Sequence, residues 1–533
     1  MSKFVFITGG VCSSLGKGVA ASSLASLMEC AGLSVSMMKC DPYINVDARN
    51  MSPFQHGEVY VTDDGTEADL DLGNYARFTH TDLSYLNTVT TGKIYNAVIE
   101  NERAGLYKGK TVQVIPHITD EIKRRMLLVA KKSNADVVLI EIGGTVGDIE
   151  SIPFLEAARQ LIHESGKGNS LCIHLTLIPS VIGGELKTKP TQHSVKGLQQ
   201  IGIQPDILLC RCENMIDADL SKKIALFCNV GKDSVFTSID VNSSIYELPL
   251  SFHEQGLDGK IIEKLGLKTG KIDVSRWKDF LMTYTNAKKS VKIALIGNKG
   301  DTGDCYKSIY ESLFYASVTG NGVRLEFVRI YAEDVYTSDD LNKTFEGVHG
   351  IVISSNYTQR GFLGKLKAIT FARENRIPYF GIDFGMHLMA IETARNLLGW
   401  DDADSSEFVV ESDHFIIGLP EEQGAASNVF HVGLEDVSLE KKSLVHSCYK
   451  TTEICERHRN KYCVSPEFMS HLNDAGLLCT GKSVDNDMIE VLEWKDHPWG
   501  IGVQYHPEFV SKPTEPHPIF NAFIKAALSG DKS

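Results

Sequence analysis

Short apolar runs that alternate with helical patterns constrain the fold of this 533-residue chain more than any other feature. They cover residues 3–8, 137–142, 207–210, 291–297 and 350–353, and polar residues or glycines flank each of them. Short runs rich in β-branched residues are typical of strands buried on both faces of a parallel sheet. The sequence therefore predicts an α/β fold with two doubly wound, mostly parallel sheets.

Two of these runs resemble the first strand of a domain. Residues 3–8 precede a glycine-rich turn and a small-residue helix from about Lys17 to Cys30, and residues 291–297 precede a helix near 306–317. A chain of this length exceeds what one hydrophobic core usually organises. We predict a first domain over residues 1–267, a more polar linker over 268–290 that contains a helix near 277–285, and a second domain over 291–533.

Composition excludes several classes of protein. Lys and Arg number 54 against 68 Asp and Glu, which gives a net charge of −14 and argues against binding to nucleic acid or an anionic membrane. The first residues do not resemble a secretion signal, and no apolar run reaches membrane-spanning length. We expect a cytoplasmic protein. Twelve cysteines are scattered, and the close pair Cys210 and Cys212 fits neither a zinc nor a redox motif, so we expect reduced thiols.

A phosphate-binding turn is predicted between the first strand and the first helix. The stretch from Thr8 to Gly18 contains Gly-Lys-Gly, and free N–H groups at a helix N-terminus together with a lysine favour a phosphate. Gly18 stands where the usual P-loop has a Ser or Thr hydroxyl for Mg²⁺. Any metal ligands must therefore come from elsewhere.

Two carboxylates and one polar cluster are candidates for the rest of such a site. Asp71 lies in Asp-Leu-Asp-Leu-Gly, and Glu141 is enclosed by apolar neighbours, where a carboxylate is costly unless a cation or donors compensate it. Residues 187–194 gather two lysines, hydroxyls and an amide, and Lys223 adds a charge in an apolar stretch. These donors suit a polyphosphate or a nucleobase, although the cluster could also be a solvated loop.

These segments together closely resemble the CTP synthase family of ATP-dependent ligases, which aminate UTP. The matching stretches are TGGVCSSLGKGV, KCDPYINVDARNMSPFQHGEVYVTDDG, DLDLGNYARF, TVQVIPHITDEI, EIGGTVGDIES, LTLIPS, KTKPTQHSVK, IGIQPDILLCR and KIALFCNV. The resemblance implies a synthetase domain followed by a class I glutaminase-type domain. It also implies a homotetramer whose subunit contacts build the UTP pocket.

The resemblance implies roles for individual residues. ATP phosphates would be held by Ser14, Leu15, Gly16, Lys17, Gly18, Val19 and Lys39, the adenosine would lie near Arg211, Ile239, Asp240 and Val241, and Mg²⁺ would be held by Asp71 and Glu141. UTP would be bound by Ser13, Lys187, Thr188, Lys189, Pro190, Thr191, Gln192 and Lys223. CTP as a feedback inhibitor would contact Asp148, Ile149 and Glu150. Lys17 and Lys39 would act on the transferring phosphoryl group, and GTP is left open as an effector.

The second domain has lost the residue on which glutaminase chemistry depends. The family elbow Gly-Ile-Cys-Leu-Gly-Met-Gln reads here from Gly381 to His387, and Asp383 replaces the nucleophilic Cys. A carboxylate attacking an amide would form an anhydride, which is higher in energy than a thioester. His506 and Glu508 correspond to the activating pair.

Other family positions in the second domain have also changed. The oxyanion-hole stretch Pro-Gly-Gly-Phe-Gly reads as residues 354–358, which include Asn356, and the elbow Gln is His387. Glu407 and Arg459 align with glutamine-binding residues. Without the nucleophile, these residues are relics of a glutamine site, structural groups or parts of another site, and we interpret the domain as one kept for folding, assembly or regulation.

Three hypotheses follow. The first is a ligase that makes CTP from UTP, ATP, Mg²⁺ and free ammonia. The second is a ligase that uses another small amine or a related pyrimidine nucleotide, because residues 48–50 and 180–184 depart from the family pattern. The third is a non-catalytic nucleotide-binding paralogue that assembles with a partner.

Overall fold

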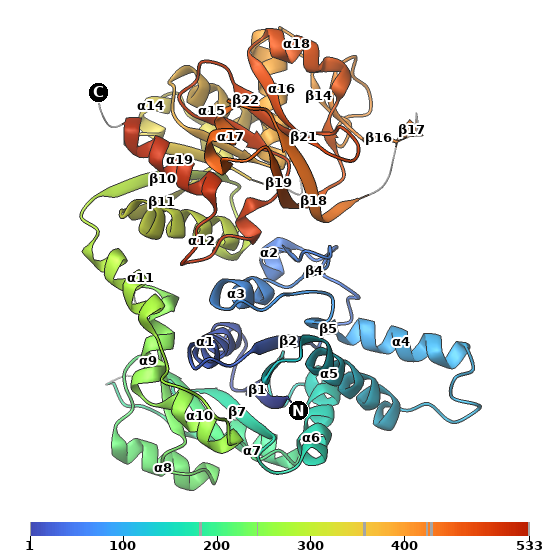
Figure 1. The fold of residues 1–533 in the computed structure, drawn as a ribbon, viewed down its shortest axis with the longest axis vertical. Coiled ribbons are helices and arrows are strands. Elements are labelled where there is room, and N and C mark those ends of the chain that lie inside the picture. The colour runs from blue at the N-terminus through green and yellow to red at the C-terminus, as the bar shows by residue number, and fades with distance from the viewer. Residues whose placement is uncertain are drawn as a thin grey trace. The chain divides into compact units, whose positions relative to one another are not determined.

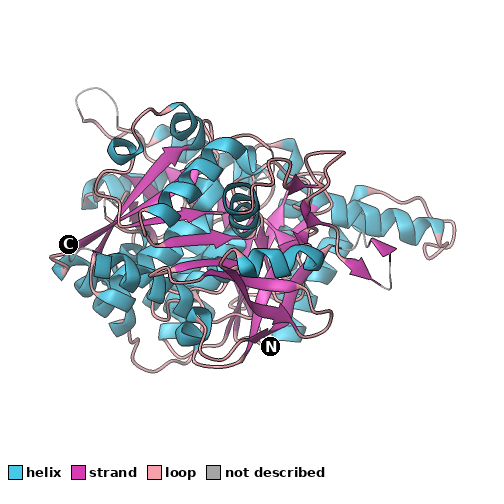
Figure 2. Ribbon diagram, turned by 90° about the horizontal axis from the view of Figure 1, so that it is seen from above, coloured by secondary structure: helices cyan, strands magenta, loops and turns pink. Residues whose placement is uncertain are grey.

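The structure is a computed structural model that describes residues 2–180, 184–241, 243–354, 359–422, 425–426 and 430–530. Its contacts divide the chain into two compact units, one formed by residues up to 51 with 68–281 and the other by 52–67 with 282–533. Each unit has a central sheet with helices packed against it, so the α/β prediction is confirmed (Figures 1 and 2). None of the described helices is both long and apolar enough to span a membrane.

The first unit is built on a seven-stranded sheet with the order β5-β2-β6-β1-β7-β8-β9. Every neighbouring pair is parallel. The strands are β1 Lys3–Gly9, β2 Val35–Asp41, β5 Thr88–Thr90, β6 Val137–Ile142, β7 Ser170–Leu177, β8 Ile207–Cys212 and β9 Val235–Ile239. The predicted strands over 3–8, 137–142 and 207–210 are therefore confirmed.

Helices cover this sheet and close its core. They are α1 Lys17–Cys30, α3 Asp71–Phe78, α4 Thr91–Arg103, α5 Thr119–Ser133, α6 Ile152–Ser165, α7 Lys189–Gln200, α8 Ala218–Cys228, α9 Leu248–Glu254 and α10 Leu257–Leu265. One face of the sheet packs Phe6 and Ile140 against Ile122 and Phe154 of α5 and α6. Because parallel strands end at one edge of a sheet, the turns after β1, β2, β6 and β8 lie at a common edge.

The second unit contains a nine-stranded sheet that is half parallel and half antiparallel. Its order is β11-β10-β12-β13-β23-β22-β21-β18-β19, with parallel pairing up to β23 and antiparallel pairing from there to β19. The strands are β10 Ser290–Gly297, β11 Arg324–Tyr331, β12 Gly350–Ile353, β13 Tyr379–Ile382, β18 His431–Leu439, β19 Glu453–Asn460, β21 Leu477–Ser483, β22 Ile489–Trp494 and β23 Gly500–Val503.

Helices and short strands complete the second unit. The helices are α12 Lys307–Tyr315, α13 Ala332–Thr337, α14 Leu341–Thr344, α15 Phe362–Glu374, α16 Phe384–Leu397, α17 Leu444–Tyr449, α18 Met469–Asp474 and α19 Pro518–Ser529. The short strands β14 Asp404–Ser405, β15 Phe415–Gly418 and β20 Cys463–Val464 form a small separate sheet. The helix α11 Ser275–Asn286 lies in the predicted linker, as the sequence indicated.

Residues 52–67 pack with the second unit, which the sequence did not predict. They contain α2 Pro53–His56 and β3 Tyr60–Val61. The buried Glu58 carboxylate accepts hydrogen bonds from the backbone N–H of Ser308 at 2.7 Å and from its hydroxyl at 2.5 Å, and Arg457 pairs with Asp63 at 2.7 Å. The domain boundaries at 267 and 290 stay a prediction.

Candidate functional site

A glycine-rich turn connects β1 to α1 in the first unit. Val11, Ser14 and Gly16 have φ values of 83°, 55° and 89°, so the backbone curls tightly before the helix begins at Lys17. A side chain at Gly10 would place its Cβ 1.5 Å from the Ser194 hydroxyl oxygen, which requires glycine there. The N-terminal N–H groups of α1 have no partners within the helix, so the turn can bind an anion.

Lys17 is held over this turn. Its Nζ donates to the backbone oxygen of Gly144 at 2.8 Å, and its aliphatic stem packs so closely on Gly9 that a Cβ there would lie 2.7 Å away. Burial lowers the pKa of the Lys17 ammonium, while the negative charge of Glu141 opposes that shift. A buried ammonium of this kind gains most from an anionic ligand.

The structure explains why Gly18 lacks the usual hydroxyl side chain. A Cβ at residue 18 would lie 2.0 Å from Oδ1 of Asp71, the first residue of α3. The Asp71 carboxylate therefore occupies the space beside the helix start where a P-loop serine or threonine would project. The sequence prediction that an oxygen ligand must come from another segment fits this arrangement.

Lys39 on β2 brings the two predicted metal ligands together. Its Nζ donates to Asp71 and, at 2.9 Å, to Oε1 of Glu141 on β6, while Asp41 lies 3.8 Å away. The Tyr75 hydroxyl donates to the other oxygen of Glu141. Lys39 is 5% exposed and Glu141 is 1% exposed. The buried carboxylate is thus compensated by a lysine and a phenol, as its cost required.

Negative charge exceeds positive charge around Lys39. Burial, opposed by the charge of Lys39, raises the pKa of Asp41 to about 6, and burial next to Asp41 and Asp71 raises the pKa of Asp69. Burial also tends to raise the pKa of Asp71, but the ammonium of Lys39 holds the pKa of this carboxyl below its usual value. Four acids around one buried lysine form an oxygen-rich, electronegative site, so these residues fit a hard divalent cation such as Mg²⁺.

Three of the predicted adenosine and phosphate residues meet at the ends of β8 and β9. The Arg211 guanidinium donates to Asp240 at 2.7 Å and to the backbone oxygen of Ser14 at 3.2 Å. Ile239 and Val241 flank Asp240 and are half-buried. Arg211 therefore links the glycine-rich turn after β1 to Asp240, the residue that follows β9.

Most of the predicted UTP residues lie at the start of α7. Thr188 and Thr191 are buried, and Gln192 donates to the Thr188 hydroxyl at 3.1 Å. Lys187 pairs with Glu185 at 2.6 Å, and the hydrogen bond from Lys187, together with the charges of Lys187 and of Lys223 on α8, lowers the pKa of the Glu185 carboxyl. Ser13 lies in the glycine-rich turn between β1 and α1, and Lys189 and Pro190 are the first two residues of α7.

The predicted CTP contacts lie on an exposed turn after β6. Asp148, Ile149 and Glu150 are all exposed, with Ile149 at 80%, and Asp148 accepts a hydrogen bond from the Thr145 N–H at 3.1 Å.

His174 is a site neighbour that the sequence analysis missed. Its imidazole links the Thr8 hydroxyl and the Ser194 hydroxyl, at 2.8 Å each, and so connects β1 to α7. Burial, together with the charge of Lys17, lowers the pKa of His174 to about 3, which keeps the ring neutral. A histidine inside the apolar run Leu-Cys-Ile-His-Leu-Thr-Leu was the signal that could have identified it.

In the second unit, Asp383 lies at a strained turn between β13 and α16. Its φ of 50° and ψ of −106° are rare for a residue with a side chain. Side chains at Gly381 and Gly385 would collide with the backbone of Gly385 and Ile353 at 2.6 Å and 2.1 Å. A strand-to-helix turn of this shape is typical of a nucleophile elbow.

Polar residues surround the Asp383 carboxylate. Gln504 donates to Asp383 at 2.8 Å and its carbonyl end is bonded to the His387 imidazole at 2.8 Å. Burial lowers the pKa of His387. Partial burial and the negative charge of Asp383 raise the pKa of Glu407 to about 7. The structure thus brings Asp383, His387 and Glu407 together.

His506 and Glu508 form a buried pair at 2.8 Å, while Nε2 of His506 has no hydrogen-bond partner among the described residues. Both line a cavity of about 30 Å³ that is also bordered by Val59 and Cys305. Arg459, another lining residue, pairs with Glu67 at 3.0 Å. Asn356 and residues 181–183 of the altered loop lie outside the described residues.

Comparisons with known proteins agree across the whole length. Residues 3–267 match the family model of the CTP synthase N-terminus, and residues 302–526 match that of class I glutamine amidotransferases. A CTP synthase of Syntrophus aciditrophicus is 49% identical over 99% of this chain and 98% of its own length. One from Carboxydothermus hydrogenoformans is 48% identical over 100% of both chains, and one from Protochlamydia amoebophila is 47% identical over 100% of this chain and 99% of its own. The glutaminase domain of Trypanosoma brucei CTPS with bound acivicin is 33% identical over 45% of this chain and 94% of its own, with a TM-score of 0.42.

Proposed function

The chain belongs to the CTP synthase family, an ATP-dependent ligase family that aminates UTP to CTP, and on that premise we propose that it uses free ammonia as its nitrogen source. We propose that the synthetase site lies in the first unit. We also propose that the glutaminase-like unit produces no ammonia of its own.

ATP phosphates are proposed to bind at the glycine-rich turn, with Lys17 and Lys39 acting on the transferring phosphoryl group. The closeness of Lys17 to the start of α1 supports this role, since the N–H groups and the ammonium offer positive charge at one place. Arg211 and Asp240 are proposed to border the adenosine, because Arg211 already contacts the turn through Ser14. Positive groups fixed before the reaction stabilise charge on the phosphoryl oxygens.

Asp71 and Glu141 are proposed to hold Mg²⁺. Both contact Lys39, and the acids around Lys39 exceed its charge. Bound there, the ion would supply positive charge to the phosphate oxygens. Tyr75 keeps Glu141 oriented through its hydroxyl.

The proposed reaction has two steps. The uracil 4-oxygen attacks the γ-phosphorus of ATP, the bond to ADP breaks, and the 4-oxygen becomes part of a phosphate leaving group. Ammonia then attacks carbon 4, and inorganic phosphate departs with that oxygen. One proton leaves N3 of the uracil during phosphorylation, and one leaves the added nitrogen as the amino group forms. Lys187 and the hydroxyls of Thr188 and Thr191 are proposed to position UTP, supported by their common place at the start of α7.

Subunit contacts are proposed to complete the nucleotide pocket in a homotetramer. The exposed turn over Asp148, Ile149 and Glu150, the proposed CTP contact, supports this, as do the exposed Ile44 and Ile152 of the same unit. Light scattering on purified protein is expected to give the mass of a tetramer. A monomer at micromolar concentration with full activity would contradict the shared pocket.

Loss of glutaminase activity is proposed because Asp383 stands at the elbow. Its carboxylate accepts a hydrogen bond from Gln504, and attack on an amide would give an anhydride. Nε2 of His506, which has no hydrogen-bond partner among the described residues, also fits a base that no longer has a thiol to deprotonate. Glu407, Arg459 and His387 would then be remnants of a glutamine pocket.

The convergence of Lys39, Asp71 and Glu141 beside the glycine-rich turn carries the proposal, and Lys39→Met tests it. This variant is expected to lower ammonia-dependent formation of CTP and ADP by at least about 100-fold, because a charge that stabilises the phosphoryl group is lost. Lys278→Met, at an exposed position on α11, is the control and should be unaffected. Full turnover in Lys39→Met would refute the assignment. A parallel arm with GTP asks whether this nucleotide stimulates the reaction.

A further inference from the structure

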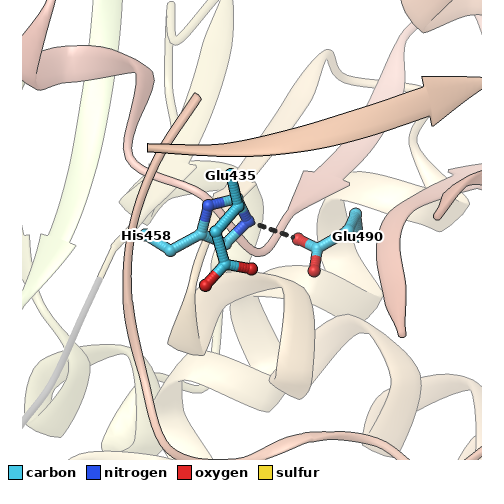
Figure 3. A group of neighbouring side chains, drawn as sticks. All are labelled: Glu435, His458 and Glu490. Atoms are coloured by element: carbon cyan, nitrogen blue, oxygen red, sulfur yellow. Dashed lines mark hydrogen bonds and ion pairs between the residues drawn. The ribbon is translucent and has the colours of Figure 1, made fainter. Parts of the chain in front are cut away.

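Three side chains that can coordinate a metal ion lie close together in the antiparallel half of the second unit's sheet. Glu435 on β18, His458 on β19 and Glu490 on β22 each offer one ligand atom, and these atoms all lie within 4.8 Å of one another. Figure 3 shows the two carboxyl groups and the imidazole gathered at one place, each from a different strand. The proposed ligase uses none of these residues.

Strand register brings two of the three side chains to the same face of the sheet. Strands β18 and β19 are antiparallel, with Glu435 opposite Glu456 and Gly433 opposite His458. Side chains alternate along a strand, so Glu435 and His458 are diagonal neighbours on one face. Their relative position is therefore a property of the sheet rather than of a loop.

The hydrogen bonds of His458 orient its ring for a cation. Its Nδ1 lies 3.0 Å from the backbone oxygen of Glu456, which can only accept, so Nδ1 carries the proton. Its Nε2 lies 2.8 Å from Oε2 of Glu490. A carboxylate and the lone pair of Nε2 are both acceptors, so either a proton or a metal ion must lie between them. A histidine whose other nitrogen donates to a carbonyl is the usual form of a metal ligand.

One carboxylate oxygen of Glu490 is an unsatisfied acceptor within the part of the chain that the structure describes. Its side chain is 0% exposed, and Oε1 has no hydrogen-bond partner among the described residues. A buried carboxylate oxygen without a donor or a cation is unfavourable. A metal ion bound by Glu490 would compensate this oxygen as well as the negative charge of the pair of glutamates.

Glu435 provides access and a further contact. Its side chain is 24% exposed, so an ion can reach the cluster from that side and keep a water ligand there. Oε1 of Glu435 lies 3.1 Å from Nδ1 of His431, which can hold the carboxylate in place. One imidazole nitrogen and two carboxylates suit a borderline transition metal better than Mg²⁺ or Ca²⁺, which prefer oxygen alone.

We propose that Glu435, His458 and Glu490 bind one divalent transition-metal ion, with Zn²⁺ favoured by the donor set, and that the ion joins β18, β19 and β22. The alternative occupant of the position between His458 and Glu490 is a proton. Burial opposes that proton, but the charge of Glu490 raises the pKa of His458 to about 9.

Zinc uptake by the untagged full-length chain tests the proposal. Metal is removed with a chelator, Mg²⁺ is added in excess to fill the oxygen site of the first unit, and Zn²⁺ is supplied by equilibrium dialysis with metal analysis by mass spectrometry. Wild-type protein is expected to bind one more zinc ion per chain than Glu435→Gln or Glu490→Gln. Each substitution should raise the dissociation constant at least about tenfold.

Glu456→Gln is the matched control. Glu456 is also a buried glutamate on β19, and it pairs with His517 at 2.9 Å, but it lies outside the cluster. This variant should bind zinc as the wild type does. Equal zinc uptake by all four chains, or no uptake by the wild type, would overturn the proposal.

Thermal unfolding gives a second readout that needs no turnover. Zinc is expected to raise the unfolding midpoint of the wild type and of Glu456→Gln, and to leave that of Glu435→Gln unchanged. Glu435 is partly exposed, so its variant should fold even where Glu490→Gln does not. The same zinc-induced shift in Glu435→Gln as in the wild type would contradict the site.

Discussion

Replacing Gly18 by serine would restore the residue that usually follows the P-loop lysine, yet we expect this change to inactivate the ligase. The new Cβ would lie 2.0 Å from Oδ1 of Asp71, whereas Cβ contacts in proteins are essentially never shorter than 3.0 Å. The carboxylate or the helix must therefore move by about 1 Å, the difference between these two distances. Asp71 cannot move freely, because Lys39 and, at 3.3 Å, Asn74 hold it.

The expected loss follows from that displacement. A misplacement of about 1 Å in a catalytic constellation typically costs about 100-fold in rate, which corresponds to about 2.7 kcal/mol in the activation free energy. Initial rates of ADP and CTP formation with ammonium chloride measure the loss in kcat for Gly18→Ser. Circular dichroism confirms that the variant is folded.

Gly259→Ser is the matched control for this prediction. Gly259 lies in α10 of the same unit, and a Cβ there would meet no atom within 4 Å. Its activity should equal that of the wild type. A kcat for Gly18→Ser within about threefold of the wild type would refute the view that Asp71 must occupy the space beside residue 18.

Three other predictions concern single side chains. Lys17→Ala should abolish ammonia-dependent CTP formation, whereas Asp383→Ala should leave it nearly unchanged, and a severe loss in a folded Asp383→Ala chain would contradict a chemically silent second unit. Asp383→Cys should release no glutamate from glutamine. The family's oxyanion stretch is also altered, and each lost oxyanion donor costs about 10²–10³ in rate. Measurable glutaminase activity in this variant would show that the altered oxyanion stretch matters less than we expect. Burial lowers the pKa of Lys365 to about 8 from its ordinary 10.5. Between pH 8 and 10.5 the unfolded chain therefore binds more protons than the folded chain. The free energy of unfolding then rises with pH, by at most about 1.4 kcal/mol per pH unit. Denaturant unfolding at pH 8, 9 and 10 should show that Lys365→Met lacks this rise, and an equal rise in both chains would contradict the buried ammonium.

Local features of the first unit could be predicted from the sequence. The strand over residues 3–8, the turn and the helix from Lys17 follow from apolar runs, glycines and helical spacing, which act between near neighbours in the chain. The absence of a hydroxyl at Gly18 also indicated that an acid from another segment would be needed. Asp71 does lie against Gly18.

Contacts between distant segments could not be predicted in the same way. Lys39 meets Glu141 because β2 pairs directly with β6, with Lys39 opposite Glu141, and strand order is not encoded in any local pattern. The docking of Glu58 on Ser308 joins residues 250 positions apart. Glu435, His458 and Glu490 likewise become neighbours only through the antiparallel half of the second sheet.

The nitrogen source is tested most directly by the products formed from purified protein with ATP, Mg²⁺ and UTP. Ammonium chloride, glutamine or neither is supplied in parallel, and mass spectrometry identifies the nucleotides. The account predicts CTP with ammonium only. CTP formed from glutamine by the purified chain would contradict the proposed loss of glutaminase activity at Asp383, and an absence of CTP in all three arms would contradict the proposed ammonia-dependent ligase itself.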